Sequence, residues 1–146
     1  MPGRGPYFAS RVPQFSCSMP YRFVPHTADV AVELRAPSET GLYQAGIDAL
    51  RELLVGASPV AAREERPVAR RGADATEQLI HFLGDALYLY DTERFIPVRV
   101  TPAGLAGERF DPARHHAQRE VKAVTRHGAA VRADRRGWRA TIVFDV

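Results

Sequence analysis

The sequence predicts an α+β protein, a two-layer sandwich in which a mainly antiparallel sheet carries two amphipathic helices on one face. Three observations lead to this prediction. Apolar and polar residues alternate over residues 29–35, as in a half-buried strand, and two later stretches repeat apolar residues at helical spacing. The last third of the chain holds short strand-like runs whose connections carry glycine, which suits the hairpin turns of an antiparallel sheet.

The composition is that of one ordinary domain. The chain has 146 residues, of which 45% are hydrophobic and 25% charged, enough for one core. We assign the domain to residues 21–146 and expect residues 1–20 to be a flexible N-terminal extension, with Met19 as an alternative natural start. No apolar run in that extension is long enough for a signal peptide or a membrane span. Because Cys17 is the only cysteine, we expect a reducing, cytoplasmic location.

The first predicted strand follows the polar stretch His26-Thr27-Ala28-Asp29. Strand alternation places its valines and leucine on the core face and Asp29 on the opposite face, where its charge is available. The core-facing residues are Val30, Val32 and Leu34, and those that share the face of Asp29 are Ala31, Glu33 and Arg35.

Two helices follow. The first is predicted over residues 39–55, with Ser38 as its N-cap and Gly56 as its C-cap. The second begins at Asp74, which forms an aspartate version of the capping box with Glu77, and its apolar stripe runs to Tyr90. Between the helices, we expect a loop over residues 57–65 and a short basic strand over residues 67–72.

The remaining third is predicted to be mostly strand. Residues 95–101 form one strand, and residues 102–116 form a long loop or an irregular hairpin. Three further runs make an antiparallel meander, with turns at His127-Gly128 and at residues 134–137, where glycine permits positive φ. These runs are residues 120–126, 129–133 and 138–146.

The candidate site consists of polar residues on these strands. Alternation with Phe144 places Asp145 on the polar face, and taking Val121 and Ala123 as core residues places Glu120 and Lys122 there too. Lys122 is the only lysine. Asp29 and Asp145, together with His26 and the terminal carboxylate of Val146, would suit a hard cation such as Ca²⁺, Mg²⁺ or Mn²⁺. The alternative is that these side chains are merely solvated.

Other clusters point less clearly to chemistry. His115 and His116 lie beside Asp111, but adjacent histidines tend to diverge. The chain has no nucleophile elbow, phosphate-binding glycine loop, CxxC pair or HExxH helix. Arginine provides all but one of the 20 basic residues and suits phosphate or carboxylate partners. No aromatic residues interleave with a basic stretch, so sequence-specific RNA binding is not expected and any RNA partner is indirect.

Four separated blocks resemble the archease family in order and approximate spacing, over residues 21–146. They are Tyr21-Arg22-Phe23-Val24-Pro25-His26-Thr27-Ala28-Asp29-Val30, Leu87-Tyr88-Leu89-Tyr90-Asp91-Thr92-Glu93, Glu120-Val121-Lys122-Ala123-Val124-Thr125-Arg126-His127 and Val143-Phe144-Asp145-Val146.

The resemblance implies an accessory protein without catalysis of its own. Archeases assist the GTP-dependent ligase that joins RNA ends carrying a 2′,3′-cyclic phosphate or 3′-phosphate to 5′-hydroxyl ends, in tRNA splicing and RNA repair. They promote guanylylation of the ligase and its multiple turnover. The resemblance implies that Asp29, Lys122 and Asp145 activate the ligase, with a divalent metal ion held by the aspartates. His26, Glu120 and Val146 are predicted to support the site.

Two alternative functions remain at this point. The family resemblance also implies a chaperone-like modulator of a tRNA methyltransferase. A stand-alone metal-dependent phosphoester hydrolase would use the same aspartates, but the sequence offers only His26 as a general base.

Overall fold

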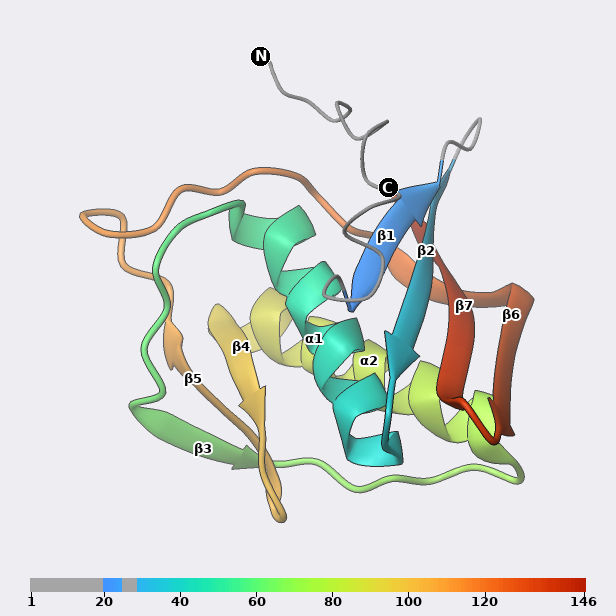
Figure 1. Cartoon of the computed structure of the whole chain (residues 1–146). Coiled ribbons are helices and arrows are strands. Elements are labelled where there is room, and N and C mark those ends of the chain that lie inside the picture. Colours follow the sequence, from blue (N-terminus) through green and yellow to red (C-terminus); the bar gives the residue numbers. More distant parts are fainter. Residues whose placement is uncertain (1–19, 25–28) are drawn as a thin grey trace.

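The computed structural model describes residues 20–24 and 29–146 (Figure 1). His26 and the predicted N-terminal extension up to residue 19 lie outside the described residues. The elements follow the chain as β1 (Tyr21–Val24), β2 (Asp29–Ala36), α1 (Glu39–Val55), β3 (Glu64–Pro67), α2 (Ala75–Glu93), β4 (Phe95–Val100), β5 (Gly104–Arg109), β6 (Ala123–Asp134) and β7 (Gly137–Asp145).

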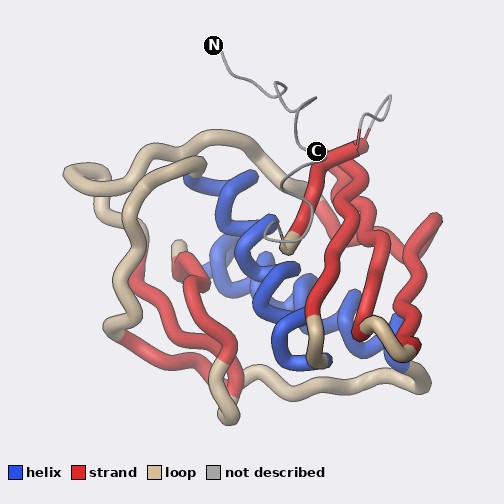
Figure 2. Tube along the Cα trace, in the orientation of Figure 1, coloured by secondary structure: helices blue, strands red, loops and turns tan. Residues whose placement is uncertain are grey.

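The strands form two antiparallel sheets with both helices between them, so the predicted α+β class is confirmed. One sheet has the order β1-β2-β7-β6, and the second has the order β3-β5-β4. Figure 2 shows the two groups of strands on opposite sides of the helices. Helix α1 packs on β2 and β4, and α2 packs on β6 and β4. The second sheet was not anticipated, because most of its strands come from short or glycine-containing segments.

Both helices form where the periodicity predicts them. The Ser38 hydroxyl accepts a hydrogen bond from the backbone N–H of Gly41 at 3.0 Å, and Gly56 ends α1 with φ of 60°. The carboxylate of Asp74 accepts from the N–H of Glu77 at 2.8 Å, and the side chain of Glu77 accepts from Ala73 at 2.8 Å. Local capping chemistry therefore fixes the helix starts.

Two predictions about the second sheet need correction. The short strand predicted over residues 67–72 lies instead at β3, which pairs with β5 and ends at Pro67. Residues 102–116 contain β5, which pairs with β4, so the hairpin alternative is correct for its first part. Gly107 is needed there because an added Cβ would lie 1.9 Å from the carbonyl oxygen of Ile96.

The turn predicted at His127-Gly128 is wrong, because β6 runs through it as one strand. Thr125 pairs with Val143 and Ala130 with Thr141, so residues 126–129 stand opposite Ile142 alone. Gly128 does adopt positive φ, 78°, but within this bulge. A glycine with positive φ thus marked an irregularity rather than a chain reversal.

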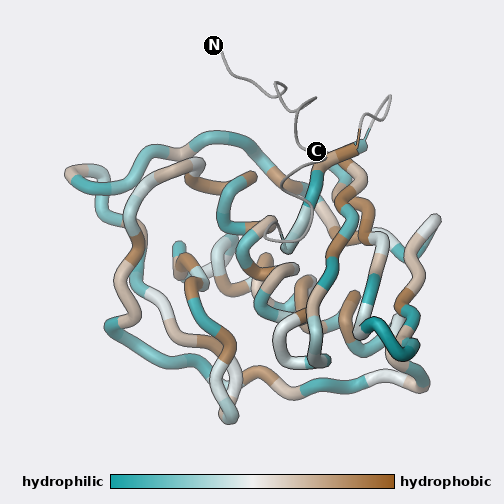
Figure 3. The backbone as a smooth tube through the Cα atoms, viewed as in Figure 1, coloured by the Kyte–Doolittle hydropathy of each residue, from teal (hydrophilic) through white to brown (hydrophobic). Residues whose placement is uncertain are grey.

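The core lies between the helices and the inner faces of the sheets. As predicted, the inner face of β2 includes Val32 and Leu34, and that of β7 includes Ile142 and Phe144, all 2% exposed or less. Figure 3 shows hydrophobic and hydrophilic positions interleaving along the strands. No helix in the described part of the chain is long and apolar enough to cross a bilayer.

Candidate functional site

The four-stranded sheet brings together the three residues that the sequence singled out. Asp29 is the first residue of β2 and pairs with Asp145, the last residue of β7. Asp145 pairs on its other side with Ala123, the first residue of β6. The backbone N–H of Lys122 donates to the carbonyl oxygen of Asp145 at 2.7 Å. The ends of three neighbouring strands therefore gather Asp29, Asp145 and Lys122 at one end of the sheet.

The two aspartates share the outer face of the sheet. Their neighbours along the strands, Val30 and Phe144, pair with each other on the core face. Residues directly opposite across antiparallel strands have Cβ atoms about 4.5–5.5 Å apart, and two like charges there are destabilising. Both aspartates are half-buried. This register therefore sets two acidic side chains next to each other on the outer face.

The donor set suits one kind of metal ion better than others. Within residues 20–24 and 29–146, no group of three or more His, Cys, Asp or Glu side chains could hold a metal. Two carboxylates fit a hard cation that keeps several waters, as Mg²⁺ does when one or two carboxylates hold it beside substrate phosphates. They do not make the closed cage of a structural zinc site. The described residues thus offer two neighbouring carboxylates but no complete set of metal ligands.

The backbone of Lys122 lies beside Asp145, but not through the strand alternation that the sequence predicted. Ala123 was expected in the core, but it is exposed on the outer face opposite Asp145. Val124, which the same alternation predicts on the polar face with Glu120 and Lys122, packs against the core opposite Phe144. The alternation fails because β6 begins only at Ala123, so the buried Val121 precedes the strand. Lys122 is exposed at the strand entry.

The predicted supporting residues have other surroundings. Glu120 is exposed and lines a groove of about 400 Å³ with Tyr90 and Arg94. The Val146 side chain is half-buried against the hydrophobic core. His26 lies outside the described residues.

A buried charge cluster around Glu108 escaped the sequence reasoning. Glu108 is 4% exposed, and Arg114 donates to both of its carboxylate oxygens, at 2.7 and 2.9 Å. The Ala61 N–H donates at 2.6 Å, and His115 Nε2 lies 3.2 Å away. The hydrogen bonds from Arg114 are the largest cause that lowers the Glu108 pKa to about 2. The cluster ties residues 111–115 to β5. A sequence pattern that showed β5 as a strand would have been needed to point to it.

This cluster gives His115 a structural role. Its Nδ1 accepts the N–H of Asp111 at 2.9 Å, so Nε2 carries the proton and faces Glu108. His116 is exposed, whereas His115 is 4% exposed, so the adjacent histidines diverge. They do not converge on one metal ion.

Comparison with known proteins gives a consistent result. The Archease protein family matches residues 21–146. Protein archease of Archaeoglobus fulgidus is 31% identical over 139 residues, which cover 88% of this chain and all of that protein. Protein archease of Methanopyrus kandleri is 30% identical over 140 residues, with 88% and 100% coverage. The solution structure of Methanobacterium thermoautotrophicum protein 1598 superposes with a TM-score of 0.70 at 24% identity, covering 88% of this chain and 99% of that one.

Fold and site together define a small α+β protein that presents a paired carboxylate at one end of an antiparallel sheet. Among the described residues, this end joins three neighbouring strands rather than enclosing a cavity. The chain belongs to the archease family, as the resemblance in the sequence predicted.

Proposed function

We propose that this protein is a cytoplasmic accessory protein of the GTP-dependent RNA ligase of tRNA splicing and RNA repair, and that it promotes guanylylation and multiple turnover of that ligase. Membership of the archease family supports the proposal. The observation that carries it is the register of β2 and β7, which sets Asp29 opposite Asp145 beside the backbone of Lys122. In this proposal, the ligase contacts the protein at this end of the sheet.

Each residue has a distinct role in this proposal. Asp29 and Asp145 would hold a divalent cation, which would supply positive charge to a partner's phosphate groups. Lys122 would add an ammonium point charge at the same end of the sheet, with a flexible stem that can follow a moving phosphate. The protein itself needs no nucleophile, because the bond-forming groups belong to the ligase.

The test is a guanylylation assay with purified cognate ligase, GTP and a divalent metal, with and without this protein. We expect stimulation by the intact chain, none from Asp29→Ala, Lys122→Ala or Asp145→Ala variants that remain folded, and no ligation by the chain alone. Full stimulation by all three variants would defeat the assignment of the site.

Two further assays, of methyltransferase aggregation and of phosphoester cleavage, separate the alternatives. A chaperone of a tRNA methyltransferase would protect that enzyme from aggregation even with both aspartates neutralised. A stand-alone hydrolase would release product from a phosphoester without any ligase. Either result, in the absence of stimulation, would replace the proposal.

A further inference from the structure

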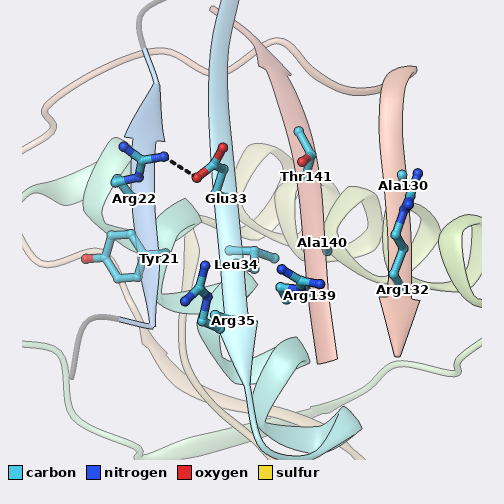
Figure 4. Close-up of a pocket in the computed structure, with 10 residues that line it drawn as sticks. All are labelled: Tyr21, Arg22, Glu33, Leu34, Arg35, Ala130, Arg132, Arg139, Ala140 and Thr141. Carbon is cyan, nitrogen blue, oxygen red and sulfur yellow. Dashed lines mark hydrogen bonds and ion pairs between the residues drawn. The ribbon is translucent and has the colours of Figure 1, made fainter. Parts of the chain in front are cut away.

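Three arginines form a row across the outer face of the four-stranded sheet. Arg35 on β2 pairs directly with Arg139 on β7, and Arg139 pairs directly with Arg132 on β6. All three side chains are exposed. Figure 4 shows them side by side along a shallow groove. Because neighbouring strands lie about 4.8 Å apart, the row spans roughly 10 Å.

The row is poorly neutralised within the protein. Arg139 has a carboxylate partner, Asp134, at 3.1 Å. Within residues 20–24 and 29–146, neither Arg35 nor Arg132 has a side-chain hydrogen bond, ion pair or stacked aromatic ring. Like charges directly opposite one another destabilise a sheet. Such an arrangement has a cost in the isolated protein that an anionic ligand would remove.

The groove around the row has a volume of about 340 Å³ and a mixed lining. Its other arginine, Arg22, is occupied by an ion pair with Glu33. Leu34 and Ala140 are buried beneath the groove and offer no exposed apolar anchor. The groups of the groove that remain available to bind an anion are therefore the guanidinium groups of Arg35 and Arg132, and in part that of Arg139.

We propose that this arginine row, Arg35-Arg139-Arg132, binds the phosphodiester backbone of a single nucleic-acid strand without reading its sequence. Guanidinium forks match phosphate oxygens in a bidentate geometry. A phosphodiester chain carries one charge on every repeating unit, so it engages such a row without needing any side-chain pocket.

An acidic polypeptide fits the same surface less well. The row crosses β2 and β7, which are paired on both sides, and ends at Arg132 on the edge strand β6. Beside Arg132, the Val131 N–H of β6 already donates to the Thr76 hydroxyl of α2 at 3.0 Å, so it is not open to an added strand. The groove also offers a peptide no apolar pocket for an anchor residue. Tyr21 is the one aromatic residue of the groove lining; it is half-buried, and its hydroxyl donates to Glu52 of α1. With no further ring for bases to stack on, we expect binding without base preference.

The row and the aspartate pair occupy the same outer face at different ends. Asp29 and Arg35 are both on β2, six residues apart, which corresponds to about 20 Å along a strand. The binding proposal does not depend on the ligase-activating function, because it concerns the other end of the sheet.

The test is fluorescence anisotropy with a labelled twelve-nucleotide oligouridylate at 50 to 200 mM salt. Three phosphate contacts predict a slope of log K against log salt of roughly −2. The double variant Arg35→Gln/Arg132→Gln should bind at least tenfold more weakly, with a flatter slope. It should also melt at the same temperature as the parent or higher, because a repulsion has been removed.

The matched control is Arg99→Gln/Arg119→Gln, which removes two exposed arginines outside the groove. It should bind like the parent. Three results would overturn the proposal: no binding at 50 mM salt, equal weakening by both double variants, or binding of a polyglutamate peptide as tight as that of the oligonucleotide.

Discussion

Asp29 and Asp145 lie directly opposite each other across β2 and β7, as the first residue of one strand and the last of the other. Their separation in sequence hides this pairing, which only the strand order reveals. The pairing places two carboxylates next to each other on one face of the sheet. At such a cross-strand position, oppositely charged or apolar side chains would be more stabilising.

The variant Asp145→Asn should reduce the stabilisation of this protein by a divalent cation. The parent is expected to melt at a higher temperature when millimolar Ca²⁺ or Mg²⁺ replaces chelator, because a cation bound to the folded state stabilises it. Loss of one of two carboxylates should weaken cation binding at least about tenfold. In chelator, the variant should be as stable as the parent or more stable by up to about 1 kcal/mol, since a like-charge pair is gone.

Glu65→Gln is the control for this experiment. Glu65 is exposed on β3, in the other sheet, and the substitution removes the same formal charge. Its cation response should equal that of the parent. An equal loss of response in both variants would mean that the cation acts through general charge screening.

Lys122→Ala should reduce stimulation of the ligase while leaving the stability of this protein nearly unchanged. The backbone of Lys122, not its side chain, bonds to Asp145, and the side chain is exposed. The free energy of unfolding should therefore change by less than about 0.5 kcal/mol. Stimulation of ligase guanylylation should fall more than tenfold. A tenfold fall in rate corresponds to a rise of about 1.4 kcal/mol in the activation free energy.

Arg119→Ala is the control for the lysine experiment, because it removes an exposed cation three residues earlier. It should leave stimulation unchanged. A Lys122→Ala protein that is strongly destabilised, yet stimulates normally per folded molecule, would show that the lysine is structural.

Glu108→Gln should destabilise the fold by about 1.5–3 kcal/mol, measured by urea unfolding. Glutamine keeps the shape and an acceptor for the Ala61 N–H, but it loses the charge that holds Arg114 and faces His115. The exposed Glu65→Gln substitution is again the comparison and should have little effect. A null result for Glu108→Gln would show that the charge cluster contributes no net stability.

The Glu108 cluster also predicts a dependence of stability on pH. The pKa of Glu108 is lowered from an ordinary value near 4.5 to about 2, mainly by hydrogen bonds from Arg114. A lowered carboxyl pKa contributes stability that is complete above the unfolded-state pKa and is lost as pH falls through the folded-state value. The contribution should therefore decline between about pH 5 and pH 2. Urea unfolding over this range should give a flatter profile for Glu108→Gln than for the parent.

The helices were predictable because their signals are local. Ser38 and Asp74 cap their helices through bonds to residues three positions away, so the sequence alone contains both partners. The extent of strand β6 could not be predicted in this way. Gly128 has the positive φ of a turn, but it lies in a bulge that depends on pairing with β7. Whether such a glycine reverses the chain is decided by the partner strand.

The candidate site was predictable only in the part that depends on local sequence pattern. Alternation along β2 and β7 placed Asp29 and Asp145 on outer faces, and the family resemblance joined them to Lys122. Their adjacency, and the pairing of Arg35 with Arg139 on the same face, required the strand order β1-β2-β7-β6. Glu108 remained hidden because its partners Arg114 and His115 belong to a segment without a periodic pattern.

Two glycine-to-alanine substitutions should have opposite effects on stability. Gly107 lies on β5, where an added Cβ would stand 1.9 Å from the carbonyl oxygen of Ile96, so the strands β4 and β5 would have to move apart. Gly107→Ala should cost about 3 kcal/mol. Gly84 lies inside α2 with nothing within 4 Å of an added Cβ, so Gly84→Ala should stabilise by about 0.5–1 kcal/mol through helix propensity. Urea unfolding of the two variants beside the parent measures both changes. Equal effects from the two substitutions would contradict the close approach of β4 to β5 at Gly107.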